Sequence, residues 1–125
     1  MLETLDSNGL ANILAQLQQP DTTIIKQATA LLKQYFKTVK ALENLLILMA
    51  GHADQAIRQM ATVYLRKLIV KHWMLLNTDD QIKTKMLLLE RFIAEPIPVV
   101  KKNIADVIGQ LGKILIPQKA WPELF

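Results

Sequence analysis

The stretch from Asp54 to Trp73, DQAIRQMATVYLRKLIVKHW, constrains the fold of this chain more than any other. Placed on a helix at about 100° per residue, it collects apolar residues on one face at i, i+3, i+4 and i+7 spacing. That face consists of Ile57, Met60, Ala61, Tyr64, Leu65, Leu68 and His72. It is wider than one neighbouring helix can cover, so the helix needs packing partners on two sides. The inner helix of a stack of helix pairs meets this need, and so does a core helix of an ordinary bundle.

The opposite side of this helix is polar. Its stripe is predicted to be exposed and consists of Gln55, Arg58, Gln59, Thr62 and Arg66. A polar face of this kind is solvated in most proteins, but it is also what a helix presents to a protein partner.

The rest of the chain predicts further helices and no strand, because long apolar-periodic segments are separated by turn signals. A first helix is expected from Ser7 or Asn8, as cap, to Gln18, and a second starts at the cap Asp21. A third is expected from Val39 to Met49, a fifth follows the cap Thr78, and a sixth runs from Val99 to Leu111. Residues expected to be buried in the second helix include Leu31, and those in the fifth are Ile82, Met86, Leu87, Leu89 and either Phe92 or Ile93.

The six helices form three pairs whose second members open alike. These openings are Ile25-Lys26-Gln27-Ala28, Ile57-Arg58-Gln59-Met60-Ala61 and Val100-Lys101-Lys102-Asn103-Ile104-Ala105. The basic residues at 26, 58 and 101 recur at intervals of 32 and 43 residues. The second interval fits the period of HEAT or armadillo repeats, about 40–47 residues, and the first is short. The pattern predicts an all-α solenoid of about three HEAT repeats, with an irregular helical bundle as the alternative.

Composition excludes several classes of protein. The chain has 51% hydrophobic and 21% charged residues, and no apolar run approaches the roughly 18 residues of a membrane helix. Its N-terminus, MLETLDSNGL, lacks the basic and apolar regions of a secretory signal. It has no cysteine, which fits an intracellular protein. The net charge of +4 is dispersed and not interleaved with aromatic residues, so we expect no direct nucleic-acid binding.

No catalytic, cofactor-binding or metal-binding constellation is recognisable. The two histidines, His52 and His72, have no ligand partner at helical spacing, and His72 is expected to fill space or to end its helix as a cation. Asp79 and Asp80 are expected to stabilise a helix start rather than to bind a metal ion. No nucleophile, base and orienting group can be assembled, so the chain is predicted not to be an enzyme and to need no cofactor.

Several motifs resemble the N-terminal domain of importin-β (karyopherin-β) family nuclear transport receptors. Ile57-Arg58-Gln59-Met60-Ala61 is followed by Leu65-Arg66-Lys67-Leu68-Ile69 and by a helix end at His72-Trp73, and Trp121-Pro122 resembles the opening of a further repeat. The Arg66-Lys67 pair, His72-Trp73 and Trp121-Pro122 are most similar to the importin-four branch. The resemblance spans nearly the whole chain. The early position of Ala28 and the basic charge depart from the family pattern.

The resemblance implies a right-handed stack of HEAT repeats at about 8–38, 39–75 and 78–113, with a fourth beginning at about 120. It implies an import receptor that shuttles between cytoplasm and nucleus, binds Ran in its GTP form through these repeats, and carries protein cargo, such as histones or ribosomal proteins, past nuclear pore proteins. The residues it assigns to Ran are Gln55, Arg58, Gln59, Thr62, Arg66, Lys101 and Lys102, with Lys26 and Lys33 as weaker candidates. Arg58 and Arg66 could instead pair with an acid of the adjacent repeat.

Two other functions are compatible with the same sequence. One is a HEAT-repeat protein-interaction scaffold unrelated to transport, and the other is a helical-repeat nucleic-acid binder, which the pI of 9.4 suggests. The apolar residues from Trp121 to Phe125 resemble the start of a helix without its partner, so we expect the chain to be a fragment whose end is frayed or covered by a neighbouring molecule.

Overall fold

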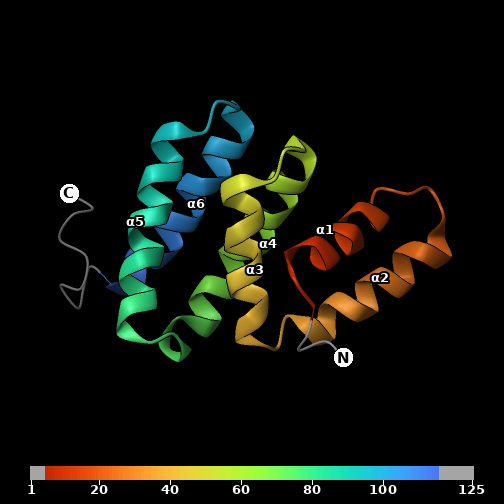
Figure 1. Ribbon diagram of the computed structural model, residues 1–125, viewed down its shortest axis with the longest axis horizontal. Helices are drawn as coiled ribbons and strands as arrows, with labels where there is room; N and C mark the ends of the chain where they lie inside the picture. Colours follow the sequence, from red (N-terminus) through yellow and green to blue (C-terminus); the bar gives the residue numbers. More distant parts are fainter. Residues whose placement is uncertain (1–4, 116–125) are drawn as a thin grey trace.

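The computed structural model describes residues 5–115, and that part of the chain is helical without strands. The helices are α1 (Ser7–Gln16), α2 (Thr22–Tyr35), α3 (Val39–Gly51), α4 (Gln55–His72), α5 (Thr78–Ala94) and α6 (Pro98–Leu115), with a short 3-10 helix, η2 (Trp73–Leu75), after α4. Figure 1 shows antiparallel pairs, α1 with α2, α3 with α4 and α5 with α6, that follow one another across the molecule. The prediction of an all-α fold of the HEAT-repeat type is confirmed.

Short polar side chains start the helices, as a hydrogen-bonding cap requires. Asp21 begins α2, as predicted, because its carboxylate accepts from the N–H groups of Thr23 and Ile24. The predicted caps of two other helices are wrong by one or two positions. Asp6, which accepts from the N–H of Gly9 at 2.8 Å, caps α1, and Asn77, which accepts from the N–H of Asp80 at 2.8 Å, caps α5.

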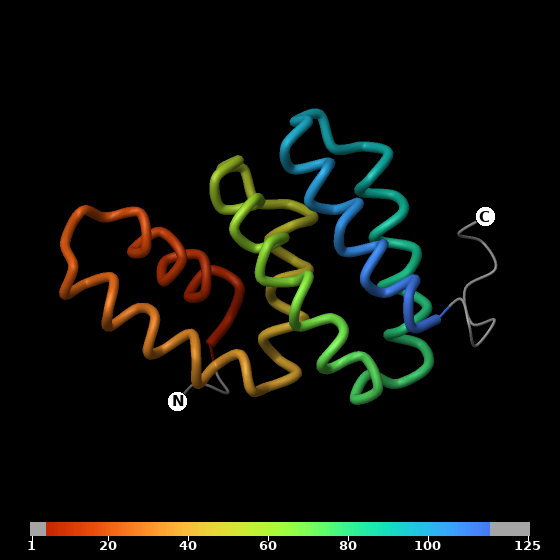
Figure 2. Tube along the Cα trace, turned by 180° about the vertical axis from the view of Figure 1, so that it is seen from behind, coloured from red at the N-terminus to blue at the C-terminus, as the bar shows by residue number. Residues whose placement is uncertain are grey.

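The last two helix pairs form two layers. In Figure 1, α3 and α5 lie in front of α4 and α6, and in Figure 2, seen from behind, α4 and α6 lie in front. Helix α4 packs against both α3 and α6, which gives it the two partners that its wide apolar face requires. Helix α1 packs against α2, α3 and α4, whereas α2 has no comparable packing against α4. We call the exposed surface of α2, α4 and α6 the inner face.

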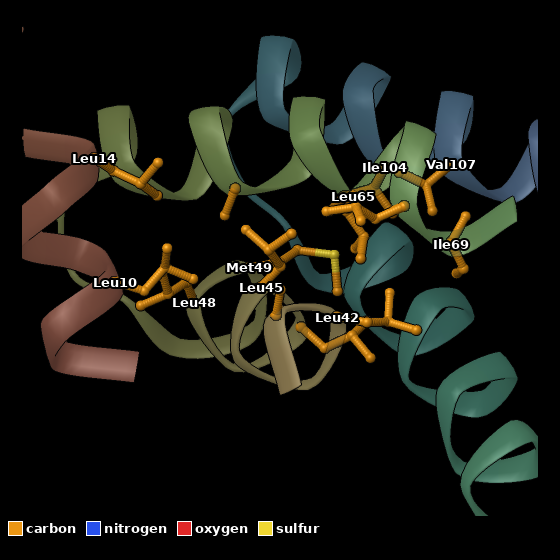
Figure 3. Close-up of a cluster of buried hydrophobic side chains, with 14 of the residues drawn as sticks. Leu10, Leu14, Leu42, Leu45, Leu48, Met49, Leu65, Ile69, Ile104 and Val107 are labelled. Carbon is orange, nitrogen blue, oxygen red and sulfur yellow. The ribbon is translucent and has the colours of Figure 1, made fainter. Parts of the chain in front are cut away.

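One apolar cluster runs through the molecule from α1 to α6 (Figure 3). The cluster is continuous because α4 lies between α3 and α6 and places apolar side chains in both contacts. Members that are labelled in Figure 3 include Leu10 and Leu14 of α1, Leu42, Leu45 and Met49 of α3, Leu65 and Ile69 of α4, and Ile104 and Val107 of α6. This continuity joins the three helix pairs into one body.

Several residues expected to be buried are exposed. Leu31 of α2 is 45% exposed, and in α5 the exposed fractions of Ile82, Met86 and Ile93 are 47%, 66% and 77%. Helix α5 instead buries Leu88 and Thr84. The reason is that α5 lies in the outer layer and packs mainly on α6, so one neighbour covers only a narrow face. The predicted segment from Trp121 to Phe125 lies outside the described residues.

Candidate partner-binding surface

The polar stripe predicted on α4 divides into a buried part and an exposed part. Arg58 turns toward the loop before α6 and Thr62 is fully buried, whereas Gln55 and Arg66 are exposed and Gln59 is half-buried. This division arises because α4 packs against both α3 and α6, and its packing against α6 covers part of the polar stripe.

Arg58 forms a buried ion pair with Glu95, which lies in the loop between α5 and α6. Its Nε donates to Glu95 Oε1 at 3.0 Å and a terminal nitrogen donates to Oε2 at 3.2 Å, so the contact is bidentate. The two side chains are 14% and 0% exposed. The other terminal nitrogen donates to the carbonyl oxygen of His52 at 2.9 Å, before the start of α4. Arg58 thus joins two inter-helix loops, and the expectation of an ion pair to an adjacent repeat is confirmed for this residue.

The environment of Glu95 favours its charged form. Burial by itself raises the pKa of this carboxyl group, because a low dielectric disfavours a charge. The hydrogen bonds from Arg58 and from the N–H of Ile97, together with the charges of Arg58 and Arg91, outweigh burial and lower the pKa below its ordinary value. The ion pair is therefore intact at neutral pH.

Thr62 is not exposed, contrary to the prediction. Its exposed fraction is 0%, and its hydroxyl donates to the carbonyl oxygen of Arg58, one turn earlier, at 2.7 Å. This bond satisfies a polar group that packing has removed from water. Thr62 is consequently not available to touch a partner in this conformation.

The exposed part of the stripe lines two shallow grooves on the inner face. Gln59 contributes to one of about 360 Å³, together with Gln18, Ala56, Met60, Val63 and Tyr64. Arg66 contributes to another of about 500 Å³, together with Lys67, Val70 and Gln110 of α6. Gln55 is exposed at the start of α4.

The two predicted lysines of α6 differ in their surroundings. Lys101 is half-buried, and its Nζ lies 5.2 Å from the ring centroid of Phe92 on α5, within the range of a cation–π contact. Lys102 is exposed. The structure therefore leaves Arg66 and Lys102 exposed and Gln59 half-buried at a separate groove, and it assigns Arg58, Thr62 and Lys101 to contacts within the molecule.

Sequence reasoning missed Val63, Lys67 and Val70, which line the grooves. The two valines were not considered because they are apolar. A signal was present: Arg58, Thr62, Leu65 and Ile69 share a second helical face, and burying this face turns Val63 and Val70 outward.

The described residues offer no sign of a metal or catalytic centre. No three His, Asp or Glu side chains come together among them as a metal site would require. His72 ends α4, where it is 4% exposed and its Nε2 lies 2.8 Å from the carbonyl oxygen of Phe36. Asp79 and Asp80 lie in the first turn of α5, as expected. None of the helices in the described part combines the length and the apolar content that a membrane crossing requires.

Comparison with known proteins gives one consistent family. Residues 28–94 match the importin-beta N-terminal domain. The chain is 34% identical over 92% of its length to a probable importin subunit beta-4 of Schizosaccharomyces pombe, and 32% identical over 96% of its length to human importin-4. It is 31% identical over 82% of its length to importin-4 of Mus musculus. The chain spans only 10% to 11% of the length of these three relatives.

Proposed function

Since this chain belongs to the importin-β family, by a match to its N-terminal domain, we propose that it is a segment of a nuclear import receptor that binds Ran in its GTP form. The proposal extends to the rest of that receptor's role: it shuttles between cytoplasm and nucleus, passes nuclear pore proteins and carries protein cargo such as histones or ribosomal proteins. Three HEAT repeats, at about 8–38, 39–75 and 78–113, are the proposed units of this segment.

The observation that carries the proposal is a polar, shallow surface on the inner face next to α6. Arg66 is exposed there and its groove extends across to Gln110, while Gln59 is half-buried and lines the separate groove toward Gln18. A protein partner needs a broad accessible surface rather than an enclosed pocket. Arg66 is the residue to which we assign the largest share of the binding energy, because arginine is enriched among interface hot spots.

The buried pair of Arg58 and Glu95 supports a second element of the proposal, the link between binding and shape. In a solenoid each repeat touches only its neighbours, so small rotations between repeats accumulate along the chain. Arg58 holds the loop before α4 against the loop before α6 and so defines one such rotation. A partner that binds across α4 and α6 would act on this boundary.

The test compares the affinity of the chain for Ran loaded with a non-hydrolysable GTP analogue and for Ran loaded with GDP. We expect the GTP form to bind at least about tenfold more tightly, and Arg66→Ala to weaken it by about tenfold. Lys83→Ala, on the outer helix α5, is the matched control and should change the affinity by less than about twofold. Equal binding of the two forms would favour an interaction scaffold unrelated to transport.

A further inference from the structure

Another groove on the inner face, which adjoins the groove at Arg66 through Lys67, is lined by four lysines. It measures about 280 Å³ and lies between the C-terminal parts of α2 and α4. Its lining is Lys33, Phe36, Lys37, Lys67, Leu68 and Lys71. We call it the lysine groove.

The lysines form two matching walls. Lys33 and Lys37 are four residues apart at the end of α2, and Lys67 and Lys71 are four residues apart at the end of α4. Residues at this spacing are neighbours on a helix surface, so each wall carries two adjacent positive charges. All four side chains are exposed. Lys37 donates to the neutral side-chain oxygen of Gln34 at 3.4 Å, which leaves its charge unbalanced.

The floor of the lysine groove is apolar and fixed in position. The ring of Phe36 packs against that of Tyr64 with 5.0 Å between centroids, and its backbone carbonyl oxygen contacts His72. Leu68 is 5% exposed. These contacts hold the end of α2 against α4, so the two walls lie on either side of a floor made by the half-buried ring of Phe36 and the buried Leu68.

No carboxylate of the two helices balances this charge, because α2 and α4 contain no Asp or Glu. The three inner helices together carry nine basic residues and one acidic residue, Asp106. The three outer helices carry four of each. The excess of positive charge in the helical part of the chain therefore lies on the inner helices. Three of these basic residues, together with Lys37, line the lysine groove.

Helix dipoles explain only part of this arrangement. The negative C-terminal ends of α2 and α4 favour cations in their last turns, which accounts for Lys33 and Lys71. Lys67 lies more than one turn before the end of α4, and Lys37 lies beyond the end of α2. Like charges at neighbouring positions are destabilising, so these two residues raise the free energy of the isolated fold.

We propose that the lysine groove binds an acidic segment of a partner protein, with carboxylates on both lysine walls and one apolar side chain on Phe36 and Leu68. This inference goes beyond the proposed Ran surface, with which the lysine groove shares Lys33, a weaker candidate for Ran, and Lys67, which also lines the groove at Arg66. A duplex nucleic acid would also satisfy the lysines, but its bases are stacked inside the helix, so it presents no apolar group to the ring of Phe36. A peptide supplies both chemistries within a few residues.

The probe is a fluorescein-labelled decapeptide, Glu-Asp-Glu-Glu-Leu-Phe-Glu-Glu-Asp-Glu, whose binding to the chain is followed by fluorescence anisotropy. We expect Lys67→Gln with Lys71→Gln to raise the dissociation constant by about tenfold. Lys40→Gln with Lys83→Gln removes the same net charge from the outer helices and should raise it by less than about twofold. Lys33→Gln with Lys37→Gln tests the other wall and should act like the first pair.

Three results would overturn the proposal. The first is equal weakening by the inner and outer pairs, which would mean attraction to net charge alone. The second is unchanged affinity for a peptide with Gln and Asn in place of its acids, or with Ser in place of Leu-Phe. The third is tighter binding of a duplex DNA or a single-stranded RNA oligonucleotide that the same inner variants abolish, which would make the groove a nucleic-acid site. Circular dichroism of each variant checks that the helices are intact.

Discussion

The basic side chains on the two sides of α4 have opposite electrostatic surroundings. Toward α6, the largely buried Arg58 forms a bidentate ion pair with Glu95, and the two helices pack directly on each other. We call this contact the closed boundary and the contact of α4 with α2 the open boundary. Toward α2, Lys67 and Lys71 face further lysines across an open groove. A basic residue on a helix therefore becomes a structural link or a partner-binding group according to whether the neighbouring element carries a carboxylate opposite it.

The two boundaries also differ in how much apolar surface they bury. Helix α4 places Leu65 and Ile69, both 0% exposed, in the central cluster that includes α6. Helix α2 buries Ala28, Leu32 and Tyr35, and its junction with α4 depends on Phe36 and His72. Local opening costs less free energy where fewer apolar groups are buried, so we expect α2 to open more readily than α6.

The largest expected effect is at the closed boundary. Arg58→Ala leaves Glu95 buried without its partner, and breaking such a pair costs about 3–5 kcal/mol of unfolding free energy. Urea denaturation at neutral pH measures the change. Arg66→Ala, an exposed arginine on the same helix, should stay within about 0.5 kcal/mol. Equal losses for the two variants would contradict the assignment of Arg58 to a buried pair.

A smaller effect at the same boundary depends on pH. Because the folded-state pKa of Glu95 is below that of the unfolded chain, its contribution is complete above about pH 4.5 and is lost as the pH falls through the folded value. Glu95→Gln should cost about 1.5–3 kcal/mol at neutral pH and flatten the fall in stability below about pH 4.5. An unchanged acid dependence in this variant would show that other carboxyl groups set it.

A substitution at the open boundary should destabilise α2 alone. His72→Leu removes the side-chain nitrogen that contacts the carbonyl oxygen of Phe36, at an expected cost of about 1–2 kcal/mol. Native-state hydrogen exchange should register this loss in the amides of α2, while those of α6 keep their protection. Equal loss of protection in both helices would mean that the two boundaries are one cooperative unit.

The smallest effect is expected in the lysine groove. Lys67→Gln removes the like charge of α4 that lies before the last turn, and it should change the unfolding free energy by no more than about 0.5 kcal/mol, in the stabilising direction. Urea denaturation at low salt measures it, and the gain should shrink as added salt screens the charges. A loss above about 1 kcal/mol would reveal contacts that this lysine makes within the fold.

Helix identity and the buried faces of α4 and α6 were predictable from local pattern. Ile57, Leu65 and Leu68 recur at helical spacing and are buried, as are Val100 and Ile104 in α6. Helix α5 was not predictable in the same way, because apolar residues occur on several of its sides. Which of them are buried depends on its position in the outer layer, and Met86 and Ile93 are exposed there.

The sequence by itself determined that this chain is helical, where its helices begin within a few residues, and which family it belongs to. These properties follow from periodicity, from capping side chains and from motifs, all of which are local. Only the tertiary structure decided which polar residues of α4 reach the surface, because that depends on the angle at which α6 covers it. The pairing of Arg58 with Glu95 and the meeting of four lysines between α2 and α4 join residues at least 30 positions apart in the sequence, and no local pattern encodes such contacts.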